Sequence, residues 1–316
     1  MERILVTGAA TWTGGRLVQQ LERRPDVTVF AVDDGAPRVA FTSEFRRIGI
    51  DGLAFAHHLL DVAPHTVIHL QTVDRSTEDG RHRAHDEAVV GAQALFGAIG
   101  RCQDTTRVIV KSDSAIYGGS ARNPSVLTED SAGRGRSDRY QRDLSDMEQF
   151  VGDAATSDPG VAYTVLRFAP IFGATIRNPL SRYLTLPAVP TLLGFDPRMQ
   201  FVHEDDALGA LVHAVDHGVP GTFNVAAPGQ IYLSRVLRLG RRVPQLLPGK
   251  MFDAALRGLA RTDLVIPRHV SALLKNGRVM DVSAMVAELG FGPSLTCRQT
   301  VLAAYGRVPV TTAEPA

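Results

Sequence analysis

The sequence predicts an α/β protein, a Rossmann-type doubly wound parallel sheet with a smaller C-terminal lobe. In the first half, short continuous apolar runs alternate with stretches of helical periodicity, as in parallel strands covered by helices on both faces. After about residue 171 this pattern loosens and prolines follow in quick succession. We therefore expect a sheet domain at 1–175, joined by 201–230, and a lobe built from 176–200 and 231–316.

The expected elements follow in chain order. Ile4 to Thr7 is a short apolar strand ended by Gly8, and the next helix places Leu17 and Leu21 on its apolar face. Further strands are expected at 27–32, 66–70, 107–110 and 163–168, and helices at 14–24, 87–99, 207–217 and 297–305.

Composition excludes several classes of protein. The 316 residues include 34 Lys plus Arg against 33 Asp plus Glu, so no basic field favours a nucleic acid or a membrane as partner. Cys102 and Cys297 are too few and too isolated for a disulfide framework or a structural zinc site, and we expect no metal. Because Ile4 opens an apolar strand three residues from the start of the sequence, we expect no signal peptide, and no apolar run is long enough to span a membrane. A cytoplasmic protein is expected.

The turn after the first strand is typical of a nucleotide site. Gly8 and Gly14 let the backbone turn tightly and approach a pyrophosphate at the start of a helix. Asp33 closes the second strand, where a carboxylate can accept hydrogen bonds from the adenine-ribose hydroxyls. This acid favours NAD(H), while Arg38 keeps NADP(H) open. The alternative is a tight structural turn with an acidic loop behind it.

In these segments the chain resembles the extended short-chain dehydrogenase/reductases, which include NAD-dependent sugar epimerases and dehydratases. The likeness covers nearly the whole chain and is closest to an actinobacterial epimerase-like branch. Besides the first turn, it rests on residues 67–70, 111–118, 128–130, 166–173, 201–207 and 221–225.

The resemblance implies a set of contact residues. Asp51 would contact adenine, and 70–72 would pass beneath the ribose of the cofactor. The full set expected at the cofactor is Gly8, Thr11, Trp12, Thr13, Gly14, Asp33, Arg38, Asp51, Leu70, Gln71, Thr72, Ser112 and Pro170. Substrate contacts are expected from Asn178, Tyr183 and His203. Family members often pair through the helices at 87–99 and 140–151, so a homodimer is possible.

The catalytic positions depart from the family pattern. Its Ser/Thr position holds Asp113, and its Tyr-x-x-x-Lys motif maps onto Tyr140 and Leu144, so the lysine that lowers the pKa of the phenol is missing. The catalytic candidates are Asp113, Ser114 and Tyr140. Asp113 has two interpretations, a base or acid beside the nicotinamide or a cap of the following loop. Thr11 replaces the middle glycine of the phosphate turn and crowds the pyrophosphate.

Three functions stay open. The first is an NAD(P)H-dependent reductase acting on a ketone of an aromatic polyketide-type molecule, in which the substrate supplies the proton. This resembles an atypical angucyclinone ketoreductase, and the apolar run 183–193 would hold a flat ring. The second is a non-catalytic dinucleotide-binding or regulatory protein. The third is a nucleotide-sugar epimerase or dehydratase, for which Arg177, Arg182 and Arg198 offer cations to a diphosphate. The missing lysine favours the first.

Overall fold

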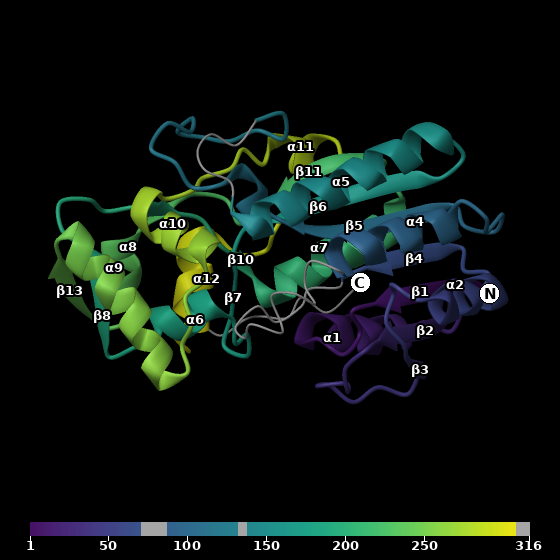
Figure 1. Ribbon diagram of the computed structural model, residues 1–316, viewed down its shortest axis with the longest axis horizontal. Coiled ribbons are helices and arrows are strands. Elements are labelled where there is room, and N and C mark those ends of the chain that lie inside the picture. Colours follow the sequence, from purple (N-terminus) through teal and green to yellow (C-terminus); the bar gives the residue numbers. More distant parts are fainter. Residues whose placement is uncertain (71–86, 132–137, 308–316) are drawn as a thin grey trace.

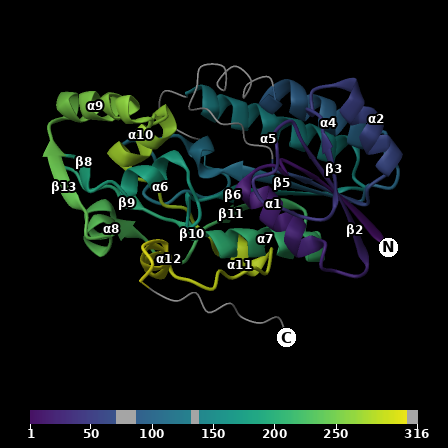
Figure 2. The ribbon, with the colours of Figure 1, turned by 90° about the horizontal axis from the view of Figure 1, so that it is seen from below.

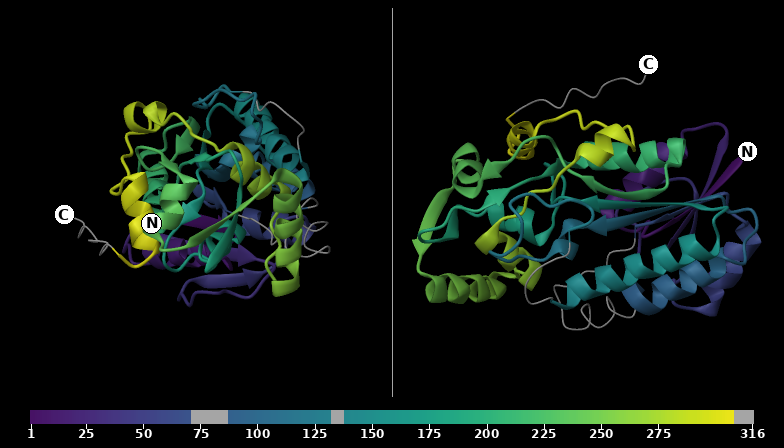
Figure 3. Two further views of the ribbon diagram at one scale, coloured as in Figure 1. Left: turned by 90° about the vertical axis from the view of Figure 1, so that its left-hand side faces the viewer. Right: turned by 90° about the horizontal axis from the view of Figure 1, so that it is seen from above.

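The structure is a computed structural model that describes residues 1–70, 87–131 and 138–307. A three-layer α/β domain occupies one end of the molecule and a smaller lobe the other (Figure 1). The lobe lies beyond the carboxyl ends of the strands of the large sheet (Figure 3).

The large sheet has seven parallel strands in the described residues, in the order β11-β6-β5-β4-β1-β2-β3. The strand order reverses beside β1, as in doubly wound sheets that bind ligands at this point. The strands are β1 (Glu2–Thr7), β2 (Val27–Asp33), β3 (Glu44–Arg47), β4 (Thr66–His69), β5 (Arg107–Asp113), β6 (Ala162–Phe168) and β11 (Gly221–Val225).

Helices cover both faces of this sheet (Figure 2). One face carries α1 (Trp12–Leu21), α7 (Glu204–His217) and α11 (Ser283–Ala287). The other carries α2 (Leu53–Val62), α4 (Ala92–Ile99) and α5 (Arg139–Ser157). The burial of both faces explains the continuous apolar runs, and the predicted fold class is confirmed.

The lobe has a hydrophobic core of its own. Short strand pairs β10–β7, β12–β9 and β13–β8 link its helices. Its elements are β7 (Ile171–Phe172), α6 (Pro179–Leu184), β8 (Ala188–Leu192), β9 (Arg198–Met199), β10 (Val202–His203), β12 (Ile231–Tyr232), α8 (Leu233–Leu239), β13 (Val243–Leu247), α9 (Gly249–Gly258), α10 (Arg268–Asn276) and α12 (Cys297–Ala304).

Several elements differ from the sequence expectation. β5 continues to Asp113, three residues beyond the predicted end. A π-helical turn, Glu87–Gly91, precedes α4 in place of one regular helix. α11 packs against β11 and the core of the sheet domain, although its residues were assigned to the lobe. Among the helices of the described residues, none has the length and apolar content that crossing a membrane requires.

Candidate functional site

The turn between β1 and α1 can be built only with glycine at two positions. Gly8 has φ +77°, in the left-handed region. A Cβ on Gly14 would lie 2.1 Å from the carbonyl oxygen of Gly8. Thr11 is the N-cap of α1, because its hydroxyl accepts from the N–H of Gly14 at 3.0 Å and donates to the Gly8 carbonyl at 2.8 Å. The first-turn amides of Trp12 and Thr13 have no intrahelical acceptor and suit an anion.

Asp33 lies at the end of β2 beside this turn. Its carboxylate accepts from the N–H of Ala10 and the N–H of Gly35, each at 2.9 Å. Burial raises its pKa, and the neighbouring Asp34 acts in the same direction. Arg38 is exposed nearby and its N–H donates to the Ala10 carbonyl. Both predicted adenosine-side residues therefore border the phosphate turn.

Trp12 links this turn to the segment after β7. Its indole N–H donates to the hydroxyl of Thr175 at 2.9 Å, and that hydroxyl in turn donates to the buried carboxylate of Glu204. Arg16 of α1 pairs with Glu204 and with Asp205 at 2.7 Å. The indole thus forms a structural bridge between α1 and the start of α7.

Asp113 and Tyr140 meet at the carboxyl end of β5. The phenol oxygen of Tyr140, in the first turn of α5, is 3.4 Å from Oδ2 of Asp113. Oδ1 of Asp113 accepts from the N–H of Ala115 at 2.7 Å and caps the following 3₁₀ turn. The two interpretations of Asp113 are therefore compatible, because one oxygen caps the loop and the other faces Tyr140.

Two cations that the sequence reasoning missed flank this pair. Lys111 lies two residues before Asp113 on β5. Arg278 reaches in from the segment after α10, and its fully buried guanidinium donates to Ser114 Oγ at 3.1 Å and to the Gly118 carbonyl. Burial lowers the pKa of each cation, and Asp113 opposes that shift in both. Alternation along β5 was the signal that could have found Lys111.

Several predicted contact residues have other functions in this fold. Ser112 points to the opposite face of the sheet, where its hydroxyl donates to Glu148 at 2.5 Å. Ser114 is fully buried behind Asp113, so its predicted catalytic use is not supported. Leu70 is buried at the end of β4, where its N–H donates to the Thr7 carbonyl.

The predicted substrate contacts are also used for structure. Tyr183 is completely buried in the lobe core and its hydroxyl donates to the Pro190 carbonyl. Asn178 caps α6, with Oδ1 accepting from the Ser181 N–H and Nδ2 donating to the Ile171 carbonyl. The remaining predicted positions fall into three groups. His203 is buried as the N-cap of α7, Asp51 and Pro170 are at least partly exposed, and Gln71 and Thr72 lie outside the described residues.

A buried polar network supports the floor of the site. Arg167 of β6 pairs with Glu148 of α5 at 2.6 Å and donates to the Tyr117 hydroxyl at 2.8 Å. That hydroxyl donates to Asn224 of β11 at 2.6 Å. With the hydrogen bond from Ser112 of β5 to Glu148, the network joins the strands β5, β6 and β11 to α5 next to Asp113.

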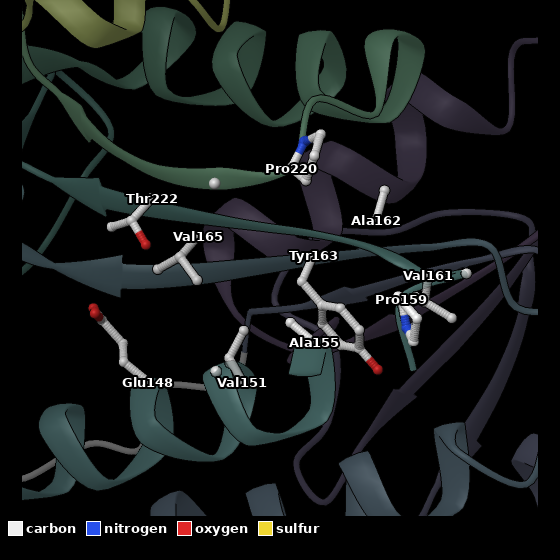
Figure 4. A pocket seen from close by; sticks show the side chains of 13 residues that line it. Glu148, Val151, Ala155, Pro159, Val161, Ala162, Tyr163, Val165, Pro220 and Thr222 are labelled. Atoms are coloured by element: carbon white, nitrogen blue, oxygen red, sulfur yellow. The ribbon is translucent and has the colours of Figure 1, made fainter. Parts of the chain in front are cut away.

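The groove in Figure 4 shares Glu148 with this network, but neither Asp113 nor Tyr140 lines it. It has a volume of about 530 Å³ and lies between α5 and the strands β6 and β11. Its lining is mostly apolar, with Val151, Tyr163 and Val165 among its walls. Within the described residues, no group of His, Cys, Asp or Glu is arranged to hold a metal ion. The chemistry therefore concentrates at the carboxyl edge of the sheet.

A family model described as the NAD dependent epimerase/dehydratase family matches residues 4–226. The chain belongs to this family. Its members are enzymes, and the family description names NAD as the cofactor, in agreement with the expected dinucleotide. The extended short-chain dehydrogenase/reductase assignment is confirmed at this level.

Relatives of this epimerase/dehydratase member are found in sequence and in structure. An uncharacterized protein of Mycobacterium tuberculosis (strain H37Rv) is 38% identical over 304 residues, 93% of this chain and 80% of that protein. UDP-glucose 4-epimerase of Thermotoga maritima superposes with a TM-score of 0.75 at 18% identity, over 96% of this chain and 98% of that one. A dTDP-glucose 4,6-dehydratase of Bacillus anthracis, crystallised in complex with NAD, superposes with a TM-score of 0.74 at 13% identity, over 97% of this chain and 96% of that one.

The residues present fit a dinucleotide. Gly14 leaves space that a Cβ would fill, the start of α1 presents amides to a phosphate, and the Asp33 carboxylate lies beside the same turn. Gly8, Gly14 and Asp33 would hold the adenosine diphosphate half. Asp113 and Tyr140 lie at the end of β5, three strands from β2 along the carboxyl edge of the sheet. This is the side expected for the nicotinamide.

Proposed function

We propose that this family member catalyses NAD-dependent hydride transfer at a carbinol or carbonyl carbon of a nucleotide sugar, with Asp113 moving the proton and Tyr140 orienting Asp113. One observation carries the proposal: Tyr140 Oη lies 3.4 Å from Asp113 Oδ2 at the carboxyl end of β5. Bound NAD supplies the hydride acceptor or donor. The chain has to position the reacting oxygen and move its proton.

Asp113 Oδ2 is the atom that receives this proton. The partner oxygen, Oδ1, already accepts the N–H of Ala115, so Oδ2 is the oxygen left to face a substrate hydroxyl. The Tyr140 phenol donates toward the same oxygen and orients it. In the reducing direction the protonated carboxyl returns its proton to the carbonyl oxygen, which is the acid–base exchange that a positioned carboxyl performs.

A nucleotide sugar is favoured over an aromatic polyketide by the lobe. In the apolar run expected to hold a flat ring, Tyr183, Leu184 and Val189 are completely buried in the lobe core and cannot line a pocket. Arg177, just before α6, and Arg182, in its last turn, are exposed and suit a diphosphate. The crystallised epimerases of this fold include complexes with UDP-sugars. The substrate-assisted reduction of a ketone is then supported only by the replacement of the motif lysine by Leu144.

The test begins with binding. NADH is titrated into the protein while the fluorescence of Trp12, the single tryptophan, is followed. Saturation is expected, and absence of binding at about 1 mM would refute NAD-dependent catalysis by this chain.

Turnover is then measured with UDP-glucose and UDP-glucuronic acid by chromatography of the products. Asp113→Asn should lower kcat by about 10²–10⁴-fold. Asp153→Asn, on the exposed face of α5, is the matched control and should leave kcat unchanged. Full activity of Asp113→Asn would overturn the assignment of the base.

A further inference from the structure

Lys111 is an unusual residue for a central strand. β5 lies between β4 and β6 in the interior of the sheet, and Lys111 pairs in register with Leu166. Its side chain is half-buried, while most lysines keep their ammonium group in water. Across 1–70, 87–131 and 138–307, its ammonium group makes no hydrogen bond or ion pair. A cation in this position carries a desolvation cost that the nearby Asp113 offsets only in part, since the pKa of Lys111 is lowered overall.

The direction of the side chain follows from the pleat. Residues two apart on a strand point to the same face, so Lys111 shares the face of Asp113 rather than that of Ser112. The hydroxyl of Ser112 contacts Glu148 on α5, so Ser112 faces α5 and Lys111 faces the other side of the sheet. Asp113 also stabilises the charge of Lys111 electrostatically. The cation therefore lies next to the proposed base, at the edge where the cofactor residues converge.

The helix offers no cation at the position where the family has one. Leu144, four residues after Tyr140, is 7% exposed and packs into the core beneath α5. The other nearby cation, Arg278, uses its guanidinium on Ser114 and the Gly118 carbonyl. Only Lys111 combines a place beside Asp113 with donors that no described residue uses.

We propose that Lys111 is the cofactor-binding cation of this site, donating from β5 to oxygen atoms of bound NAD beside Asp113. Lys111 would supply from β5 the positive charge that the lysine of the family's Tyr-x-x-x-Lys motif supplies from the helix equivalent to α5. The inference rests on the proposed function, since it needs a dinucleotide along the carboxyl edge.

The first experiment measures the dissociation constant of NADH for the wild type, Lys111→Met and Lys250→Met. Lys250 is exposed on α9, far out in the lobe, and is the matched control. Lys111→Met should weaken binding by about 10- to 100-fold, the loss of one charge-assisted hydrogen bond. Lys250→Met should bind as the wild type does. Equal or tighter binding by Lys111→Met would overturn the inference.

A stability measurement separates binding from a structural function. The urea midpoint of Lys111→Met should equal or exceed that of the wild type, because the change removes a cation that no described residue pairs with. A lower midpoint would assign Lys111 to the fold instead. Failure of the wild type itself to bind NADH would count against the proposed function, whereas equal binding by all variants would count against Lys111 alone.

The charge of Lys111 can also be followed directly. The chain has three lysines, Lys111, Lys250 and Lys275. In the double variant Lys250→Arg/Lys275→Arg, ¹³C-dimethylation leaves one labelled side chain, whose NMR signal reports its titration. The pKa should lie below the ordinary lysine value, and NADH should raise it. A signal that NADH does not move would refute contact with the cofactor.

Discussion

Glu148→Gln should lower the free energy of unfolding by about 3–5 kcal/mol, because it leaves a buried guanidinium without a counter-ion. The side chains of Glu148 and Arg167 are 10% and 13% exposed and pair at 2.6 Å. The Arg167 Nε also lies 3.1 Å from both carboxylate oxygens. Ser112 adds a third donor to the same carboxylate.

The magnitude follows from what remains after the substitution. The Arg167 guanidinium stays charged after the substitution, because an arginine side chain is not deprotonated in proteins. Its other acceptors, the Tyr117 hydroxyl at 2.8 Å and the Glu129 carbonyl at 2.6 Å, are neutral. Glutamine keeps one oxygen for hydrogen bonding, which places the expected loss near the lower end, about 3 kcal/mol.

Urea denaturation followed by circular dichroism measures this loss. The matched control is Glu44→Gln, since Glu44 and Arg46 form an ion pair at 3.0 Å with side chains 50% and 53% exposed. That change should cost about 0–1 kcal/mol, with an unchanged m-value. If Glu148→Gln also cost less than about 1 kcal/mol, the argument that this pair is desolvated would be refuted.

The remaining predictions concern the turn, a buried histidine and the catalytic tyrosine. Gly14→Ala should abolish NADH binding in the fluorescence titration, because its Cβ would lie 2.1 Å from a carbonyl oxygen, whereas Gly97→Ala, with open space in α4, should bind normally and stabilise the fold by about 1 kcal/mol. Burial lowers the pKa of His69 from 6.5 to about 4, so its neutral form contributes stability that is complete above pH 6.5 and lost as the pH falls toward 4. The loss should reach about 3 kcal/mol in urea titrations, and His69→Asn should flatten it. Tyr140→Phe should reduce kcat less than Asp113→Asn does, since the phenol only orients the base; an equal loss would make the tyrosine the proton donor.

The sequence predicts the parts of this protein that local rules determine. Gly8 and Gly14 indicate the phosphate turn because a tight βα turn restricts the backbone there. In the structure Gly8 has a positive φ, and Gly14 leaves no room for a Cβ. Tyr183 was wrong as a substrate contact because an aromatic residue next to a family segment has the same local pattern in a pocket as in a core.

The end of β5 shows a different limit. Residues 111–113 are polar, so the predicted strand ends at Val110 and strand alternation is not applied to Lys111, although β5 continues to Asp113. Arg278 comes from 164 residues after Ser114 in the chain, and no periodicity signals such a contact. The charged surroundings of Asp113 therefore emerge only when these two distant segments of the chain are placed together.

The position of β11 sets the order in which this protein can fold during synthesis. β11 pairs with β6 along Thr164–Phe168, and almost every residue of β6 is buried. Until residue 225 has left the ribosome, β6 is an open edge with unpaired backbone groups, and α7 does not yet cover the sheet. Such an edge pairs readily with other chains. A nascent chain that stalls near residue 175 would therefore be a substrate for chaperones rather than a finished domain.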